Sequence, residues 1–198
     1  MHAQSKQLIA TIAAALAVGL CVGLEAVDVR VGHNKAFDFK AVKTWAWNPK
    51  AAGDVIMART QQDDAAAMKE YADPLIRDAV AAAMKERGLQ PAESQPDVTV
   101  TYYLLLSTNM STQTMGQFLP ATTAWGIPPF AQATQSLSVM NMGSLVLDLT
   151  AQDVVVWRGV AQAKIKLGEE TEKRTALLRE AVRDLLKRFP PKQYMEPL

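Results

Sequence analysis

The clearest pattern in the sequence is a long alternation of apolar and polar positions in its C-terminal third. Odd positions from Val155 to Leu167 are apolar or small, and even positions from Arg158 onward are mostly polar. Successive side chains of a strand point to opposite faces, so this alternation predicts a half-buried β-strand. Residues 145–149 alternate in the same way, and residues 150–153 form a polar break. The whole stretch therefore predicts a β-hairpin.

The alternation also assigns faces within this hairpin. Trp157 falls on the apolar face, so we expect it in the core, where its ring can bury a large apolar surface. Arg158 falls on the opposite face, where we expect an exposed side chain with a cross-strand partner.

Three other segments have strand patterns. Residues 27–31 alternate valine with charged side chains, and residues 41–47 are rich in β-forming residues before the break at Asn48. Residues 97–106 alternate and then become apolar on both faces, which is typical of a strand in the centre of a sheet. Residues 50–62 show no clear periodicity.

Two main helices are predicted. Residues 73–74 are Asp-Pro, a typical start, because Asp accepts bonds from the free N–H groups of the first turn and Pro fits the first helical position. Apolar residues at helical spacing then continue to a stop at Gly88, which predicts a helix over 74–87. Residues 63–71 predict only a turn or two. The second helix is predicted over 170–189, where proline follows.

These elements predict an α+β fold, in which a sheet of about four to six strands packs against the two main helices. The chain has 198 residues, of which 49% are hydrophobic. A chain of this size can bury a sizeable core, so we expect a single domain over 27–198.

Residues 1–26 differ in composition from the rest. Lys6 precedes an uncharged apolar run at 8–24, and Glu25 and Ala26 close it. This layout is typical of a secretory signal peptide, so we expect a cut after Ala26 and export to the periplasm. An uncleaved anchor is the alternative, because an apolar run of about 17 residues is at the lower limit for spanning a bilayer.

The only cysteine, Cys21, lies within this apolar run, so no intramolecular disulfide can form. Lipoproteins are acylated at a cysteine that follows a small-residue box, but Leu20 stands where Gly or Ala is expected. We interpret Cys21 as a small apolar residue of the signal peptide. Lipidation of Cys21 is the alternative, and it would make the chain an outer-membrane lipoprotein that is held to the membrane through its N-terminus.

The segment 107–136 breaks the pattern of the other elements. It has no charged residue, three prolines and two glycines. Loops of this length are usually functional or disordered, and the aromatic residues argue against plain disorder. We expect it either to bind an apolar ligand or an unidentified envelope protein, or to cap an open end of the sheet. The candidate binding residues are Phe118, Trp125, Ile127 and Phe130.

Several other functions find no support in the residues. Lys and Arg total 21 against 20 Asp and Glu, with no basic stripe, so nucleic acid is not an expected partner. The only histidines are His2, in the signal peptide, and His33, isolated in a turn-like stretch. Metal sites need clustered ligands, so we expect neither a metal site nor a cofactor.

Carboxylate pairs are the remaining route to catalysis. Asp38 could act with Asp148 or Asp153 in a hydrolase, which is one alternative function. However, Asp38 sits near a strand start between aromatic residues, and Asp153 sits in a turn, where Asp favours local backbone bonding. We therefore expect structural roles for them and no enzyme activity.

Several short motifs occur in an order that resembles a known family. They are Phe37–Lys40, Lys43–Trp47, Lys85–Leu89, Pro96–Tyr102, Leu145–Leu149, Val155–Gly159 and Phe189–Pro191. Together they resemble DUF4136, a bacterial envelope domain of unknown function that is found mostly in proteins assigned as lipoproteins. The resemblance implies a small α+β domain, with an antiparallel sheet and helices packed on it, in the cell envelope. It supplies no catalytic residues, so the expected function is a non-catalytic binding or structural component.

Overall fold

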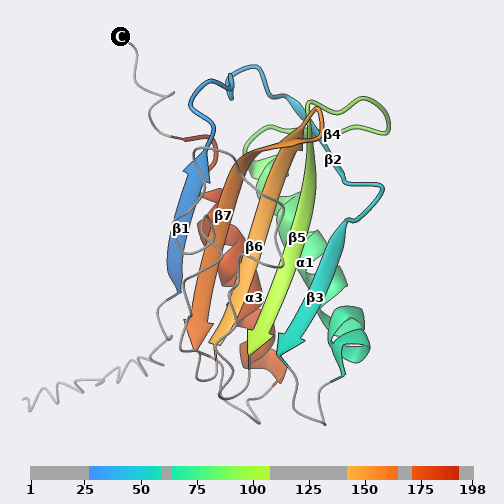
Figure 1. Cartoon of the computed structure of the whole chain (residues 1–198), viewed down its shortest axis with the longest axis vertical. Coiled ribbons are helices and arrows are strands. Elements are labelled where there is room, and N and C mark those ends of the chain that lie inside the picture. Colours follow the sequence, from blue (N-terminus) through green and yellow to red (C-terminus); the bar gives the residue numbers. More distant parts are fainter. Residues whose placement is uncertain (1–26, 59–63, 108–141, 165–170, 192–198) are drawn as a thin grey trace, which may run out of the picture.

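The chain is described by a computed structural model that covers residues 27–58, 64–107, 142–164 and 171–191. This part of the chain forms a seven-stranded sheet and two helices (Figure 1). In chain order the elements are β1 (Asp28–His33), β2 (Thr44–Trp47), β3 (Gly53–Ala58), α1 (Ala65–Glu86), β4 (Gln90–Pro91), β5 (Val98–Ser107), β6 (Met142–Ala151), β7 (Val154–Lys164) and α3 (Thr171–Leu186).

The sheet is mixed. Its strand order is β1-β7-β6-β5-β2-β4, and β3 also pairs with β5. The pairs β1–β7, β7–β6 and β6–β5 are antiparallel, whereas β2 and β3 run parallel to β5. The predicted α+β class is confirmed, although the sheet is neither purely antiparallel nor limited to six strands. Since α1 carries the chain from β3 back to the start of β5, the two strands run in the same direction.

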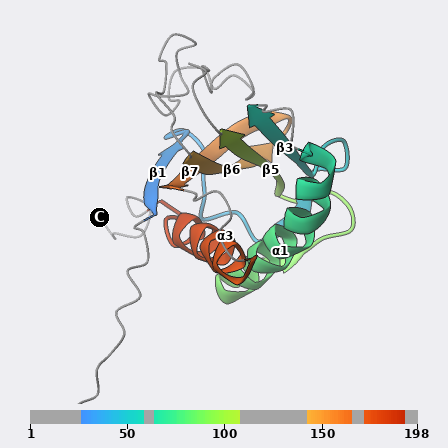
Figure 2. The same cartoon turned by 90° about the horizontal axis from the view of Figure 1, so that it is seen from below.

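Both helices lie on one face of the sheet (Figure 2). The space between helices and sheet is a single apolar core. Its fully buried members include Ile76, Met84, Val100, Tyr102, Leu147, Leu149, Trp157 and Leu185. We call the opposite side of the sheet the helix-free face, because no helix of the described ranges packs on it (Figure 2).

The hairpin predicted from the alternation is present as β6 and β7. The two strands pair antiparallel and are joined by Gln152 and Asp153, whose φ angles are 49° and 61°. Positive φ at both central residues is the geometry of a two-residue turn whose twist matches that of the strands. Trp157 is 0% exposed and lies in the core on the helix side, as predicted.

The strand β3 was not predicted, because residues 50–62 show no period of two. Its Gly53–Ala58 segment pairs with Tyr102–Ser107 along its whole length. The strand is therefore specified by hydrogen bonds and packing against β5 rather than by its own pattern.

The predicted start of the first helix is wrong. α1 begins after Asp64, whose side chain accepts bonds of 2.9 and 3.1 Å from the N–H groups of Ala66 and Ala67. Pro74 lies inside the helix and removes one hydrogen bond. The helix continues through it because Ala72 and Ile76, one on each side, are both 0% exposed in the core.

The predicted helix ends are closer to the structure. Gly88 follows α1 with a φ of 76°, a left-handed conformation that ends helices and favours glycine. The second predicted helix is present as α3, although it ends at Leu186 rather than at residue 189. None of the described helices combines the length and the apolar character that crossing a membrane requires.

Candidate functional site

The binding residues predicted from the sequence lie outside the described part of the chain. They are Phe118, Trp125, Ile127, Phe130 and, for lipidation, Cys21. The structure does describe the two positions that flank the long segment. Ser107 at the end of β5 pairs directly with Met142 at the start of β6. Residues 108–141 therefore connect two paired positions on neighbouring strands.

The three carboxylates considered for catalysis occupy separate places. Asp38 lies in the exposed turn between β1 and β2, where its Oδ1 accepts a bond of 3.0 Å from the Lys40 N–H. Asp153 lies in the exposed turn of the β6–β7 hairpin. Asp148 lies within β6, on the helix-free face, and is 1% exposed. Among the described residues, no hydrogen bond or ion pair joins any two of the three.

Asp148 instead pairs across the hairpin with Arg158. The Arg158 Nε donates to Oδ1 and its Nη2 donates to Oδ2, each at 2.6 Å. Both side chains are 1% exposed. Arg158 does lie opposite Trp157, as predicted, but the expectation that it is exposed is wrong. Burial raises the pKa of Asp148, and the hydrogen bonds and positive charge of Arg158 oppose that shift.

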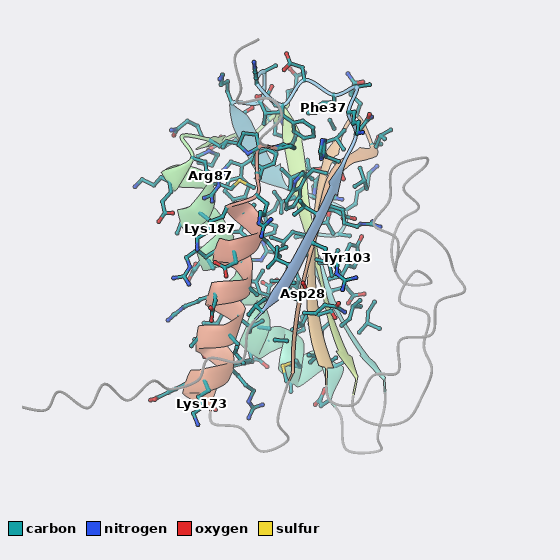
Figure 3. All side chains as sticks on the ribbon, turned by 90° about the vertical axis from the view of Figure 1, so that its left-hand side faces the viewer. Asp28, Phe37, Arg87, Tyr103, Lys173 and Lys187 are labelled. Atoms are coloured by element: carbon teal, nitrogen blue, oxygen red, sulfur yellow. The ribbon has the colours of Figure 1, made fainter. Side chains whose placement is uncertain are left out.

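This ion pair belongs to a buried cross-strand ladder on the helix-free face. Gln162 lies opposite Ser144, and its Nε2 donates to the Ser144 Oγ at 3.2 Å. Between this pair and the ion pair, Val146 lies opposite Val160, and both valines are 0% exposed. Tyr103 lies on the side of the sheet away from α3 (Figure 3). Burial, followed by the negative charge of Asp148, raises the pKa of its hydroxyl. The ladder consists of paired groups rather than free carboxylates.

A pocket of about 450 Å³ lies at the other side of the sheet, between the β2–β3 connection and α1. It is lined by Lys50, Ala51, Ala52, Gly53, Lys69, Glu70, Asp73, Pro74 and Arg77. We call it the β2–β3 pocket. Five of these residues are charged, so the lining is strongly polar.

The pocket forms where one edge of the sheet is interrupted. β2 and β3 both pair with β5, on residues 98–100 and 102–107 respectively, so they follow one another along the same edge (Figure 1). The Asn48 N–H donates to the Val100 carbonyl at 3.0 Å, and the Ala52 carbonyl accepts from the Tyr102 N–H at 3.2 Å. The chain between these two bonds leaves the sheet and forms one wall of the pocket.

Tyr102 passes beneath this wall. A Cβ atom added to Gly53 would lie 1.8 Å from the Tyr102 ring, so only glycine fits at this position. The hydroxyl of Tyr102 donates to Asp73 Oδ1 at 2.8 Å. Burial, and then this hydrogen bond to a carboxylate, raises the pKa of Tyr102 well above its ordinary value.

Asp73 links this tyrosine to an arginine in the pocket. Its Oδ2 accepts a bond of 2.6 Å from the Nε of Arg77, one helical turn later. The Arg77 Cζ lies 4.8 Å from the ring centroid of Trp47, within the range of a cation–π contact. The Trp47 ring packs edge-on against Tyr102, with centroids 6.4 Å apart. Asp73 of α1 and Trp47 of β2 therefore hold the guanidinium in place, and Tyr102 of β5 contacts both of them.

The described residues give no sign of a metal centre. Within those ranges, no three His, Cys, Asp or Glu side chains gather closely enough to hold an ion. The ring of His33 packs edge-on against Phe39, with centroids 5.8 Å apart, and burial lowers its pKa.

Neither the ladder nor the pocket was predicted from the sequence. Asp73 has the typical position of a helix cap, and Tyr102 falls on an apolar strand face, so neither residue stands out in the linear pattern. The one available indication is the tyrosine hydroxyl itself, since a buried tyrosine usually needs a hydrogen-bond partner.

Comparison with known proteins identifies a family. A family model described as a domain of unknown function, DUF4136, matches residues 29–191. None of the curated proteins matches the chain.

The solved structures that match the chain come from several bacteria. A PDZ domain protein from Parabacteroides distasonis has a TM-score of 0.50 at 10% identity, over 84% of this chain and 36% of that protein. The chain thus spans about a third of its length. A DUF4136 family protein from Bacteroides thetaiotaomicron has a TM-score of 0.47 at 16% identity, over 83% and 96%. A dodecamer of PelC from Paraburkholderia phytofirmans has a TM-score of 0.35 at 9% identity, over 81% and 95%.

Proposed function

The chain belongs to the DUF4136 family, and we propose that it is an exported, non-catalytic component of the bacterial cell envelope that binds another envelope molecule. The uncharged segment between β5 and β6 is the proposed contact. The observation that carries this proposal is the direct pairing of Ser107 with Met142, between which the whole uncharged segment is inserted.

The pairing of Ser107 with Met142 fixes the positions of the two ends of the segment. Positions 107 and 142 end a run of nine paired positions between β5 and β6, so the two ends of the segment are held by the centre of the sheet. A rigid scaffold that presents a long loop is a common arrangement for binding. Phe118, Trp125, Ile127 and Phe130 supply apolar surface in a segment without charges, which favours an apolar ligand or a protein partner.

Export is supported by the N-terminal sequence and by the position of the first strand. The run at 8–24 has the composition of a signal peptide. β1 begins at Asp28, so a cut after Ala26 leaves every described strand and helix intact. Acylation of Cys21 is the alternative, and it would leave the same elements on a lipid anchor.

The non-catalytic part of the proposal is supported by the state of the carboxylates. The Asp148 carboxylate has both oxygens bonded to Arg158 and is 1% exposed, which disfavours a role as a general acid or base. The alternative of a hydrolase that uses Asp38 and Asp148 predicts that Asp38→Ala abolishes an activity while the fold survives.

The test is photo-crosslinking in intact cells, with the crosslinker introduced at position 125 of the full chain. Removal of residues 112–130, with the crosslinker moved to position 110, should abolish the crosslinked species. The double variant Phe118→Ser/Phe130→Ser should weaken it. Val154→Ser is the matched control, because Val154 is a 54% exposed apolar side chain in the hairpin. An undiminished set of crosslinked partners after the deletion would remove the role of this segment.

A further inference from the structure

We propose that the β2–β3 pocket binds a small ligand through an anionic group, a carboxylate or a phosphate, which Lys50, Lys69 and Arg77 hold. This proposal depends neither on export nor on the segment between β5 and β6. It concerns a different surface, formed by the β2–β3 connection and the first half of α1.

The first argument is the balance of charge in the pocket. Its lining contains three cations and two carboxylates. Asp73 is already neutralised, because its two oxygens accept from Arg77 and from the Tyr102 hydroxyl. In the described ranges, no residue forms an ion pair with the ammonium group of Lys50 or of Lys69. Within the described ranges, Glu70 is then the one remaining carboxylate of the lining against two lysines without an ion-pair partner, so the pocket keeps a net positive charge.

The second argument is the preorganisation of Arg77. Its Nε is bound to Asp73 and its guanidinium lies against Trp47, so the plane of the group is held from two sides. No described group accepts a bond from its terminal nitrogens. An arginine whose orientation is fixed loses little side-chain entropy when it binds a carboxylate or phosphate, and both groups match the fork of its N–H donors.

The third argument is the shape of the wall. Ala51, Ala52 and Gly53 form it, and their small side chains leave the volume of about 450 Å³ open between the lysines. A volume of this size lies within the range of pockets that bind small molecules. The break between β2 and β3 thus creates room for a ligand as well as access to Arg77.

Glu70 sets the limit on the charge of the ligand. Its exposed carboxylate lies in the same lining and repels a second negative charge. Pro74 has no N–H, so the Glu70 carbonyl lacks its usual helical partner and adds another acceptor in the pocket. The site therefore favours a ligand with one anionic group over a ligand that carries several.

The experiment is a titration of the isotopically labelled protein, purified from cells that express the full chain and followed by the NMR shifts of backbone amides. Sodium phosphate and sodium acetate are the two probes, and sodium chloride at equal ionic strength is the reference. We expect saturable shifts confined to residues 50–53 and 69–77. Tighter binding of phosphate indicates a phosphate-bearing ligand, tighter binding of acetate indicates a carboxylate, and both results support the site.

Variants separate the site from general charge effects. Lys50→Gln and Lys69→Gln should each weaken binding about 1.5- to 5-fold, the range measured for exposed charge pairs, and Glu70→Gln should strengthen it by a similar factor. Lys85→Gln is the matched control, because Lys85 lies on α1 outside the pocket lining and should leave affinity unchanged. The proposal is overturned if neither probe gives saturable shifts, or if the Lys50→Gln/Lys69→Gln double variant binds as tightly as the parent.

Discussion

Asp148 and Arg158 face each other across the β6–β7 hairpin and form two hydrogen bonds of 2.6 Å on the helix-free face, each side chain being 1% exposed. The pair lies on the side of the sheet opposite the apolar core of Trp157. Removal of two charges from water is unfavourable, so their attraction and hydrogen bonds must offset that desolvation. The pair thus depends on both partners being present.

Loss of one partner should therefore be far more harmful than loss of both. We expect Arg158→Met to lower the free energy of unfolding by about 3–5 kcal/mol, because Asp148 is left as a buried, uncompensated charge. The double variant Asp148→Leu/Arg158→Met should recover most of this loss. Urea denaturation, monitored by circular dichroism, measures the free energy of unfolding of both variants.

An exposed pair provides the control for this experiment. Arg30 and Asp28 are 3.0 Å apart, with side chains 51% and 56% exposed. Arg30→Met should change the free energy of unfolding by less than about 1 kcal/mol. If Arg30→Met and Arg158→Met lower the free energy of unfolding equally, the buried pair contributes no more to stability than the exposed pair.

Gly53 should tolerate no side chain while Tyr102 is in place. A Cβ at Gly53 would lie 1.8 Å from the Tyr102 ring, so Gly53→Ala should lower the free energy of unfolding by about 1–3 kcal/mol, the usual effect of overpacking. In a Tyr102→Ala background the same change should have little further effect. Thermal unfolding of the parent, the two single variants and the double variant completes the double-mutant cycle.

Gly88 is the control for Gly53, because glycine is required there by the backbone conformation and not by a neighbouring side chain. Its φ is 76° and no atom lies within 4 Å of an added Cβ, so Gly88→Ala should lower the free energy of unfolding by about 1 kcal/mol through the backbone alone. This loss should be the same with or without Tyr102. If Tyr102→Ala instead leaves the effect of Gly53→Ala unchanged, the clash with the ring is not its cause.

Asp97 should make stability depend on pH in the acid range. Hydrogen bonds from the Lys43 N–H and from the hydroxyl and N–H of Thr44 lower the pKa of its carboxyl. The unfolded chain therefore takes up this proton first. The stabilisation should be complete above the unfolded pKa of about 3.9 and should fade as the pH falls through the lower, folded pKa.

The measurement is the difference in free energy of unfolding between the parent and Asp97→Ala as a function of pH. Because Asp97 is exposed, we expect a difference of no more than about 1 kcal/mol at neutral pH that shrinks below pH 4. Glu93→Ala, which removes an exposed carboxylate from the same connection but none of these hydrogen bonds, is the control for the substitution itself. A difference that grows on acidification would contradict the assignment.

The sequence predicted those elements whose pattern is decided by one buried face. The alternation in β5, β6 and β7 identified the strands, the turn and the core position of Trp157, since each contacts the helices on one side. It placed Arg158 on the correct face but not in a buried position, because alternation does not indicate whether the second face is covered.

The elements that depend on several segments at once could not be predicted in this way. β3 is specified by parallel pairing with β5. α1 begins at Ala65 rather than at Pro74 because packing of Ala72 and Ile76 outweighs the missing bond at Pro74. The β2–β3 pocket requires the register of β5, the break in the edge strand and one face of α1 together. Their combined geometry is not encoded in any single stretch.

Export is the premise of the proposed function and can be tested directly by intact-mass spectrometry of the chain, recovered from fractionated cells. We predict that the periplasmic fraction contains an unmodified chain that begins at Val27. A chain that begins at an acylated Cys21 in the membrane fraction would support the lipoprotein alternative instead. An unprocessed chain that begins at Met1 and remains in the cytoplasmic fraction would contradict the proposed function.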